Sequence, residues 1–409
     1  MRILFVSQIV PYPPHGGVLQ RGYNLLRELA RDHDVHLLAF HHPDELPFGE
    51  PLQRGRAALA SFCREVEFFA LWPKKSQAHK LLALGLAAIH PLPFSVLAQR
   101  NAALSRRISE LCQGTGPPDI VHLDTVALAP FAAACGRVPA VLTHQNVESR
   151  LLERRAEHER GALQRRYVVA QARRLRSYER EVCGQFPLNI TVSPADATLL
   201  KEICPDARTF VVPNGVDTVY FQPRRGAETP AVVFTGGMNM FANRDAVEWF
   251  LEEVWPLVKS AVPGARFFAI GQRPSQRVLD AAATDDSVIA PGHVADVRPW
   301  VEQAAVYVVP MRVGGGTRLK VLDAMAQGKA IVSTSLGAEG IDASNGTHLM
   351  LADDARSFAG TVVDLIGRPD RRNALGDAAR ARVESHYAWR ILGRQLAAAY
   401  ADVVARYRP

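Results

Sequence analysis

The sequence predicts an α/β fold made of two doubly wound domains whose parallel sheets face each other across a cleft. The chain has 409 residues, which is about the length of two ordinary α/β domains. Short apolar runs alternate with amphipathic helical stretches, the pattern of parallel sheets covered by helices. A polar segment rich in Gly and Pro, near 214–230, interrupts this alternation once before it starts again.

The apolar runs are continuous, as in VYVVP, which is typical of strands buried on both faces of a parallel sheet. Before the interruption we expect strands at 2–7, 34–40, 65–71, 119–123, 140–144, 188–192 and 209–213. After it we expect strands at 231–236, 265–271, 287–292, 306–311, 330–334 and 348–352. The predicted domains are residues 1–215 and 231–385, with a linker at 216–230 and a closing helical stretch at 386–409.

The composition indicates a globular protein of a reducing compartment. Hydrophobic residues make up 48% and charged residues 22% of the chain. No apolar run reaches the roughly 18 residues of a membrane span, and the start lacks the features of a signal peptide. The five cysteines are scattered without a C-x-x-C pair. We therefore expect a cytoplasmic protein, with peripheral contact to the inner face of the membrane as a further hypothesis.

The net charge of +7 is concentrated in one helical stretch, since residues 150–181 hold ten Arg and five Glu. A basic helix face binds anionic lipid head groups, whereas Glu–Arg pairs at helical spacing indicate a solvated helix. The apolar stretch at 80–96 also has two interpretations, which are contact with a membrane and packing in the core. Nucleic acid is not an expected partner, because no aromatic-plus-basic pattern accompanies the charge.

The most informative segment is a glycine-rich loop between a strand and a helix. Three glycines at 314–316 follow the strand at 306–311, and Thr317 occupies a helix-cap position. Such a loop exposes backbone N–H groups and the positive end of the helix dipole, and its glycines allow close approach of a ligand. The spacing is neither that of a Walker A loop nor G-x-G-x-x-G, which disfavours an ATPase or a dinucleotide oxidoreductase.

Two cations at the start of this helix indicate an anionic ligand. Helix first turns favour Asp and Glu, yet this one carries Arg318 and Lys320. A diphosphate satisfies the N–H groups, the dipole and both cations together. Asp323, one turn further on, is placed to accept hydrogen bonds from ribose hydroxyls. The alternatives are a solvated loop and a simple Lys320–Asp323 surface pair.

Other polar clusters also follow strands, at the sheet edge where ligands bind in doubly wound folds. Gly16 and Gly17 follow the first strand in PYPPHGG, with a plain proline-rich turn as the alternative. His144, in THQNVES, ends the strand at 140–144, where a reacting group would be exposed. Lone histidines are more often structural. In the second domain, Asn243 is interpreted as a helix cap.

Three further residues of the second domain complete the candidate set. Gly237 ends the strand at 231–236, His293 lies in PGHV, whose backbone can border a base, and Glu339 follows the strand at 330–334. The candidate catalytic residues are His144, Arg318 and Lys320. The candidate donor-binding residues are Gly16, Gly17, Gly237, His293, Gly316, Thr317, Asp323 and Glu339. No metal site is expected, since Asp285–Asp286 and Asp353–Asp354 lie in turn-like or helix-start settings without partner histidines.

Several of these motifs together resemble a known family. PYPPHGG, HQNVES, VPNGVD (212–217), GHVADV (292–297) and GGGTRLKVLDAMAQGKAIVSTSLGAEGI (314–341) occur in the order found in the family-4, or group 1, retaining glycosyltransferases of GT-B fold. The resemblance extends from Met1 to about Trp389. Its variants are most similar to bacterial sugar transferases of exopolysaccharide clusters, including those associated with exosortase systems.

The resemblance implies two Rossmann-like domains, an N-terminal one for the acceptor and a C-terminal one for a nucleotide diphosphate sugar. It implies transfer to a glycan or polyprenyl-linked acceptor with retention and without metal. Gly16 and Gly17 would then lie near the diphosphate, and His144 would contact the donor sugar. By the same resemblance, Thr317, Arg318 and Lys320 would hold the diphosphate, and Asp323 would bind the ribose. The final helix would pack back on the N-terminal domain.

Two departures from the family pattern leave alternatives open. The E-x7-E motif has Gly315 at its first position and Asp323 at its last. The usual Gly-Arg after the first strand of the second domain is Gly237-Met238, so that one phosphate-binding Arg is missing and Arg318 is a possible substitute. The alternatives to a transferase are a non-catalytic sugar-nucleotide-binding module and a nucleotide-sugar epimerase of the same fold.

Overall fold

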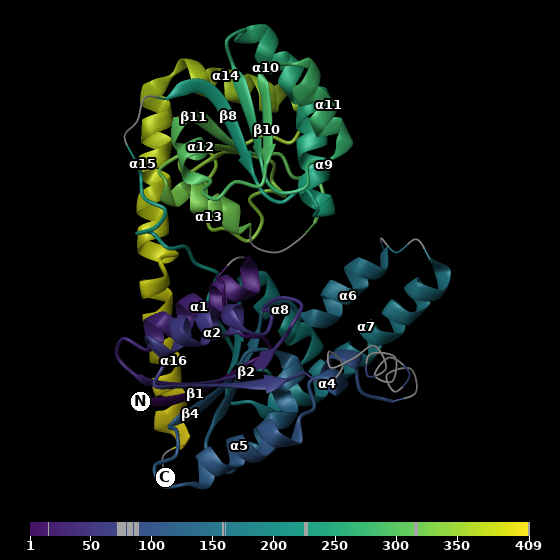
Figure 1. The fold of residues 1–409 in the computed structure, drawn as a ribbon, viewed down its shortest axis with the longest axis vertical. Coiled ribbons are helices and arrows are strands. Elements are labelled where there is room, and N and C mark those ends of the chain that lie inside the picture. The colour runs from purple at the N-terminus through teal and green to yellow at the C-terminus, as the bar shows by residue number, and fades with distance from the viewer. Residues whose placement is uncertain are drawn as a thin grey trace. The chain divides into compact units, whose positions relative to one another are not determined.

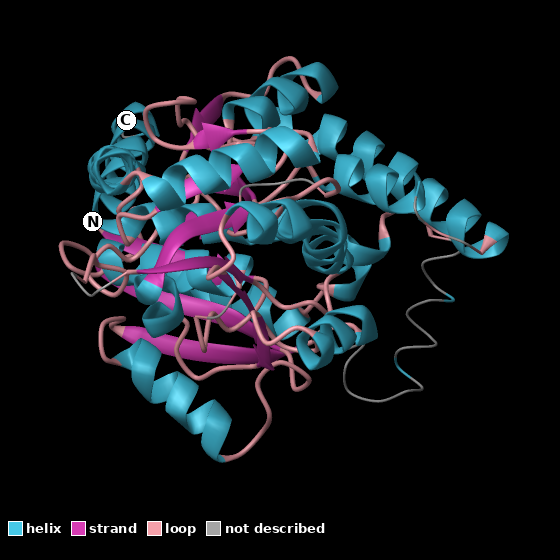
Figure 2. Cartoon of the chain, turned by 90° about the horizontal axis from the view of Figure 1, so that it is seen from above, coloured by secondary structure: helices cyan, strands magenta, loops and turns pink. Residues whose placement is uncertain are grey.

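The chain folds into two compact units, each of which is described by itself. The computed structural model describes residues 1–14, 16–71, 79, 85, 90–157, 159, 161–224, 228–314 and 318–407. The first unit comprises Met1–Pro213 and Leu392–Pro409, and the second comprises Asn214–Ile391. Each unit is a parallel sheet packed between helices (Figures 1 and 2). The prediction of two doubly wound α/β units is confirmed.

The first unit contains a seven-stranded parallel sheet of order β3-β2-β1-β4-β5-β6-β7. Its strands are β1 (Arg2–Ser7), β2 (Asp34–His41), β3 (Glu65–Ala70), β4 (Ile120–Leu123), β5 (Ala140–His144), β6 (Asn189–Thr191) and β7 (Thr209–Val211). Its helices are α1 (Gly17–Leu29), α2 (Glu50–Ala60), α4 (Phe94–Ala98), α5 (Ala102–Gln113), the 3₁₀ segment η2 (Val126–Cys135), α6 (Glu148–Glu157), α7 (Ala162–Val182), η3 (Cys183–Gln185) and α8 (Pro194–Ile203).

The second unit contains a six-stranded parallel sheet of order β10-β9-β8-β11-β12-β13. Its strands are β8 (Thr229–Thr235), β9 (Arg266–Ile270), β10 (Val288–Gly292), β11 (Ala304–Val309), β12 (Ala330–Ser333) and β13 (Met350–Leu351). Its helices are α9 (Phe241–Trp249), the π segment η4 (Phe250–Val254), α10 (Trp255–Ala261), α11 (Gln276–Thr284), α12 (Arg298–Gln303), α13 (Leu319–Ala326), α14 (Ala355–Gly367) and α15 (Pro369–His386).

All the predicted strands are present, with ends that differ by at most about two residues. The central strands are buried on both faces, as the continuous burial of β11 shows. Val306 and Tyr307 of β11 pair with Val232 and Val233 of β8 on one side, and with Ala330 and Ile331 of β12 on the other. Burial on both faces explains why these strands are apolar along their whole length.

The segment predicted as a linker packs largely on the second unit. Val216 is buried and forms a bridge with Ala388. Arg380 of α15 donates hydrogen bonds to the backbone carbonyls of Thr218 and Phe221. These contacts hold residues 216–221 against the second unit.

The last helix, α16 (Trp389–Tyr407), belongs to the first unit from Leu392 onward. The hydroxyl of Tyr400 is hydrogen-bonded to Nδ1 of His122 at 2.6 Å, and both side chains are buried. His122 stacks on Phe5 of β1 at a centroid distance of 4.0 Å. Burial of an aromatic hydroxyl with a partner at the centre of the sheet is a strong anchor for this helix.

Helices α6 and α7 pack against each other as a hairpin, which Figure 1 shows extending beyond the sheet of the first unit. This hairpin contains most of the basic stretch at 150–181. Several of its arginines pair with glutamates at helical spacing, such as Arg150 with Glu153 at 3.0 Å and Arg155 with Glu159 at 3.1 Å. Leu163, in the first turn of α7, is 84% exposed.

Candidate functional site

The candidate site lies where the strand order of the second sheet reverses. β8 and β11 are neighbours in the sheet, and the chain proceeds outward from them in opposite directions. In doubly wound folds the loops after such a pair diverge and leave a crevice for a ligand at the carboxyl edge. The two loops are Gly236–Met240, which precedes α9, and the segment 310–318, which precedes α13.

Arg318 lies at the end of the glycine-rich loop and is the N-cap residue of α13. Gly314 has φ +103°, a backbone conformation that favours glycine. A Cβ at Gly314 would lie 3.0 Å from Nη2 of Arg318 and 3.4 Å from Cβ of Ala242. The guanidinium therefore packs over the glycine backbone, next to the start of α9. Gly315, Gly316 and Thr317 lie outside the described residues.

Lys320 reaches from α13 to the turn that follows β8. Its Nζ donates a hydrogen bond to Oδ1 of Asn243 at 2.8 Å and lies 4.0 Å from the ring centroid of Phe234. A Cβ at Gly236 would lie only 2.5 Å from this Nζ. Because Gly236 has no side chain, the ammonium group can sit directly against the backbone of the turn.

Asp323 lies one helical turn after Lys320. Its Oδ1 is buried and has no hydrogen-bond partner among the residues that the structure describes. Nearby, Thr235 of β8 and Tyr307 of β11 share a hydrogen bond of 2.5 Å between their hydroxyl groups. Burial raises the pKa of Tyr307, and the Asp323 carboxylate raises it further. This electrostatic effect indicates that the two groups lie close together. A buried oxygen without a donor is an acceptor open to a ligand hydroxyl.

The two charged groups perturb each other's ionisation. Burial, with a further contribution from Arg318, lowers the pKa of Lys320 to about 7. Burial also raises the pKa of Asp323 to about 7, and Lys320 opposes that rise. A bound anion would favour the charged form of Lys320. Binding of an anion at the start of α13 would therefore increase the positive charge on Lys320.

The other predicted residues of the second unit lie at the same sheet edge. The backbone carbonyl of Gly237 accepts a hydrogen bond from Nδ2 of Asn243 at 2.9 Å, so Gly237 adjoins Lys320. His293 follows β10 and has an exposed side chain. Glu339, also exposed, lies in the loop after β12, one strand beyond β11. The structure therefore gathers Arg318, Lys320, Asp323 and Gly237, with His293 and Glu339 on the flanking loops.

The expectation that Asn243 caps a helix is wrong. The N-cap residue of α9 is Met240, and Asn243 lies in the first turn of that helix. Its side chain is instead committed to Lys320 and to the carbonyl of Gly237. Sequence spacing gives no signal for the first of these bonds, because 77 residues separate Asn243 from Lys320. The pair Thr235–Tyr307 has no signal in the sequence either, because 72 residues separate the two and each looks like an ordinary strand residue.

His144 is buried, so the expectation that its ring is exposed at the strand end is wrong. The side chain is 1% exposed, and its Nε2 is hydrogen-bonded to Oδ1 of Asn189 at 3.0 Å. Cys183 lies 3.9 Å away, and Nδ1 has no hydrogen-bond partner in the described part of the chain. The two contacts come from β6 and from η3, which lie later in the chain of the first unit. The assignment of His144 to the donor sugar stays a prediction.

The buried ring of His144 makes the first unit sensitive to acid. Burial lowers the pKa of His144 from 6.5 to about 4. The unfolded chain therefore binds a proton between those values that the folded chain does not bind. We expect the free energy of unfolding to fall by about 3 kcal/mol as the pH drops from 6.5 to 4. Urea denaturation of wild-type protein at several pH values measures this loss.

The matched control for this prediction is His144→Gln, which keeps a polar side chain but cannot titrate. The difference between the two proteins isolates His144, since burial raises the pKa of the neighbouring Glu148 to about 7 and of Glu179 as well, with opposite effects on stability. An identical pH dependence in both proteins would contradict the prediction.

Gly16 and Gly17 form an open backbone turn in the first unit. Gly16 is the N-cap residue of α1 with φ +88°, and Gly17 is the first residue of that helix. Both are exposed, and a Cβ at Gly16 would meet nothing within 4 Å. The turn lies between β1, an interior strand of the sheet, and α1. Space and backbone conformation therefore permit close approach of a ligand, and the binding role of both glycines stays a prediction.

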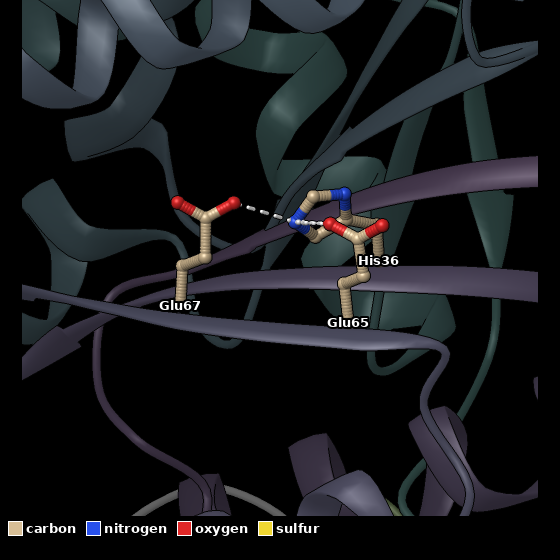
Figure 3. Close-up of side chains that lie close together, drawn as sticks. All are labelled: His36, Glu65 and Glu67. Atoms are coloured by element: carbon tan, nitrogen blue, oxygen red, sulfur yellow. Dashed lines mark hydrogen bonds and ion pairs between the residues drawn. The ribbon is translucent and has the colours of Figure 1, made fainter.

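One group of side chains in the described residues has the composition of a metal site. His36, Glu65 and Glu67 lie on the neighbouring strands β2 and β3 of the first unit (Figure 3). His36 Nε2 is 2.9 Å from Glu67 Oε1, and Arg107 Nε donates to both Glu67 oxygens at 2.8 and 3.1 Å. Arg107 already neutralises the carboxylate that a cation would need, so an ion-pair network explains the cluster.

In the described part of the chain, no helix combines the length and the apolar character that crossing a bilayer requires.

Comparison with known proteins agrees with the architecture. Solved structures with similar folds include Anabaena Alr3699/HepE in complex with UDP, with a TM-score of 0.67, 16% identity and coverage of 98% of this chain and 100% of that one. Sucrose-phosphate synthase from Thermosynechococcus elongatus has a TM-score of 0.67, 16% identity and coverage of 99% and 100%. Two Rossmann-like units with these neighbours define the GT-B fold of glycosyltransferases.

The family follows from the sequence models that match. The model described as "Glycosyltransferase Family 4" matches residues 15–220, which is half of the chain, and "Glycosyl transferases group 1" matches residues 229–368. The chain belongs to glycosyltransferase family 4.

Curated relatives match over part of their length. The GDP-mannose-dependent monoacylated alpha-(1-6)-phosphatidylinositol monomannoside mannosyltransferase of Corynebacterium glutamicum is 25% identical over 45% of this chain and 54% of its own. The lipopolysaccharide core biosynthesis mannosyltransferase LpcC of Rhizobium leguminosarum bv. viciae is 25% identical over 44% and 55%. An uncharacterized 44.6 kDa protein in the cps region of Klebsiella pneumoniae is 28% identical over 32% and 36%. The chain thus spans between about a third and somewhat over half of the length of each of these relatives.

Proposed function

We propose that this protein transfers a sugar from a nucleotide diphosphate sugar to a glycan or polyprenyl-linked acceptor, with retention of configuration. The observation that carries the proposal is the cluster of Arg318, Lys320 and Asp323 at the carboxyl edge of β8 and β11. It supplies two cations for a diphosphate and, for a ribose hydroxyl, the buried acceptor Asp323 Oδ1, which has no hydrogen-bond partner among the described residues. Family membership and the UDP-bound structural neighbour support this choice of donor.

The chemistry that these residues can contribute is stabilisation of the leaving group. Negative charge develops on the departing diphosphate as the bond to the anomeric carbon breaks. Arg318 and Lys320 are preorganised to neutralise it, which contributes more in a partly buried site than in water. The configuration of the anomeric carbon is retained when the acceptor hydroxyl attacks that carbon from the same side as the departing diphosphate. Because these cations and the start of α13 can neutralise the leaving group, the proposal requires no metal.

The test is a donor screen with defined products. Purified protein is incubated with UDP-, GDP- and TDP-sugars, with and without a polyprenyl-phosphate-linked acceptor. GDP-mannose belongs in the screen because three relatives are named as mannosyltransferases. NMR of the product reports whether the anomeric configuration is retained, and a parallel reaction with EDTA reports metal dependence. Binding without transfer or hydrolysis for every donor would instead favour a non-catalytic sugar-nucleotide-binding module.

We also propose that the α6–α7 hairpin contacts anionic lipid when the acceptor is membrane-bound. Arg165 and Arg166 are exposed in the first turn of α7, beside the exposed Leu163. Cations attract anionic head groups, and an exposed leucine adds apolar burial in the interface. The stretch at 80–96, the other candidate for membrane contact, lies mostly outside the described residues.

Reversing two charges of this hairpin is expected to weaken membrane binding. Each Arg near an anionic surface contributes about 1 kcal/mol, so Arg165→Glu with Arg166→Glu should reduce binding to phosphatidylglycerol vesicles by at least about tenfold at low salt. Vesicle flotation measures the bound fraction. The control is Arg394→Glu with Arg406→Glu, which changes the net charge equally on α16. Wild-type protein that does not co-float, or equal losses in the two variants, would argue against hairpin binding.

A further inference from the structure

We infer that Asn243 is a positioning residue of the donor site, which holds the ammonium group of Lys320 against the glycine turn after β8. This inference rests on the proposed function and deepens it. The turn carries Gly237-Met238 and no cation of its own. The positive charge beside the turn therefore comes from α13, and a side chain from a third element must keep it there.

The hydrogen bonds of Asn243 join both parts of this arrangement. Its Oδ1 accepts from Lys320 Nζ at 2.8 Å, and its Nδ2 donates to the carbonyl of Gly237 at 2.9 Å. A side-chain amide can accept from an ammonium through its oxygen and donate to a carbonyl through its nitrogen at the same time. Asn243 lies in the first turn of α9, so its backbone is fixed by a regular helix.

The surroundings leave Lys320 dependent on this contact. Its Nζ lies over the face of Phe234, which attracts a cation without fixing its direction. The charged groups of its own helix that act on it are Arg318, which repels it, and Asp323, which attracts it. Without Asn243, attraction by Asp323 would draw the ammonium group toward the proposed ribose position. Asn243 thus keeps the cation at the turn, where the diphosphate is expected.

Gly236 is the second part of the arrangement. A Cβ at this position would lie 2.5 Å from Lys320 Nζ and 3.0 Å from Asn243 Nδ2. The nearest atoms are the ends of side chains, so Gly236→Ala should displace the ammonium group from the turn. Because φ of Gly236 is +150°, alanine would strain the backbone there as well. This variant disturbs the same arrangement without removing either partner.

The test is a double-mutant cycle on nucleotide binding, with UDP, GDP and TDP as the probes in isothermal titration calorimetry. We expect Asn243→Ala to weaken binding about tenfold, and Lys320→Met about thirtyfold. Because a positioning residue acts through Lys320, adding Asn243→Ala to Lys320→Met should change affinity by less than about twofold. A purely structural role of Asn243 would instead give the same tenfold loss in both backgrounds, and that result would overturn the inference.

Two further variants keep the test decisive. Gln303→Ala, which removes an amide at the opposite edge of the same sheet, is the control and should leave affinity unchanged. If Asn243→Ala unfolds, Asn243→Ser, whose shorter side chain cannot form both hydrogen bonds, takes its place in the cycle with the same expected non-additivity, and additivity there overturns the inference. Wild-type protein that binds neither UDP, GDP nor TDP overturns the proposed function and this inference together. Binding that depends on Lys320 with normal affinity in Asn243→Ala overturns this inference alone.

Discussion

Replacing Arg318 and Lys320 together by alanine is expected to lower kcat/KM for the preferred donor by at least about 10³-fold. Each cation is proposed to act on the diphosphate, where charge develops as the sugar leaves. Removing one preorganised group of this kind typically costs about 10² to 10³ in rate. The loss should fall on both KM and kcat, because the diphosphate is already charged in the bound donor and gains further charge in the transition state.

Arg312→Ala is the matched control for the double variant. Arg312 belongs to the same loop, but its guanidinium is paired with Asp245 at 2.8 Å and packs near Trp249. Its charge is already neutralised, so we expect a change of less than about threefold in kcat/KM. Steady-state kinetics with the donor found in the screen compares the three proteins. Turnover retained within tenfold in the double variant would rule out this assignment of the diphosphate site.

Donor affinity is expected to fall as the pH rises above 7. The pKa of Lys320 is lowered to about 7, so the unliganded protein loses this cation between pH 7 and 9. The diphosphate binds the charged form and raises its pKa, which links binding to uptake of a proton. The dissociation constant should then increase by up to about tenfold per pH unit across this range. Titration with UDP-glucose and GDP-mannose measures it, because the diphosphate of a nucleotide sugar keeps its charge there.

Lys320→Arg separates the two groups that titrate in this range. A guanidinium stays charged at pH 9, so this variant should bind donor with little pH dependence. Asp323, whose pKa is raised to about 7, remains in the variant and gains negative charge over the same range. A dependence as steep in Lys320→Arg as in wild-type protein would assign the effect to Asp323 instead.

The order of elements and the edge at which the site lies could be predicted from the sequence, because both depend on local patterns. Continuous apolar runs require strands buried on both faces, and alternation with helices requires parallel sheets. The loop at 314–318 was recognised because cations at a helix start conflict with the helix dipole unless an anion is present. Arg318, Lys320 and Asp323 do converge at the reversal of strand order, as those patterns implied.

Contacts between residues distant in the chain were decided by the tertiary structure. The partners of Lys320, of the shared hydroxyl pair Thr235–Tyr307 and of the buried His144 come from other elements, and no spacing rule connects them. His144 shows the difference most clearly. Its place at the end of β5 follows from the sequence, but its burial comes with contacts to Asn189 and Cys183, which lie about 40 residues further along the chain.

Short-range periodicity, composition and motif order are enough to predict the two doubly wound units, the cationic start of α13 and the likeness to a known family. The hydrogen bond from Lys320 to Asn243 and the burial of His144 appear only in the folded chain. Hydrogen bonding and burial depend on which side chains meet in space, and folding brings together residues that no local pattern relates.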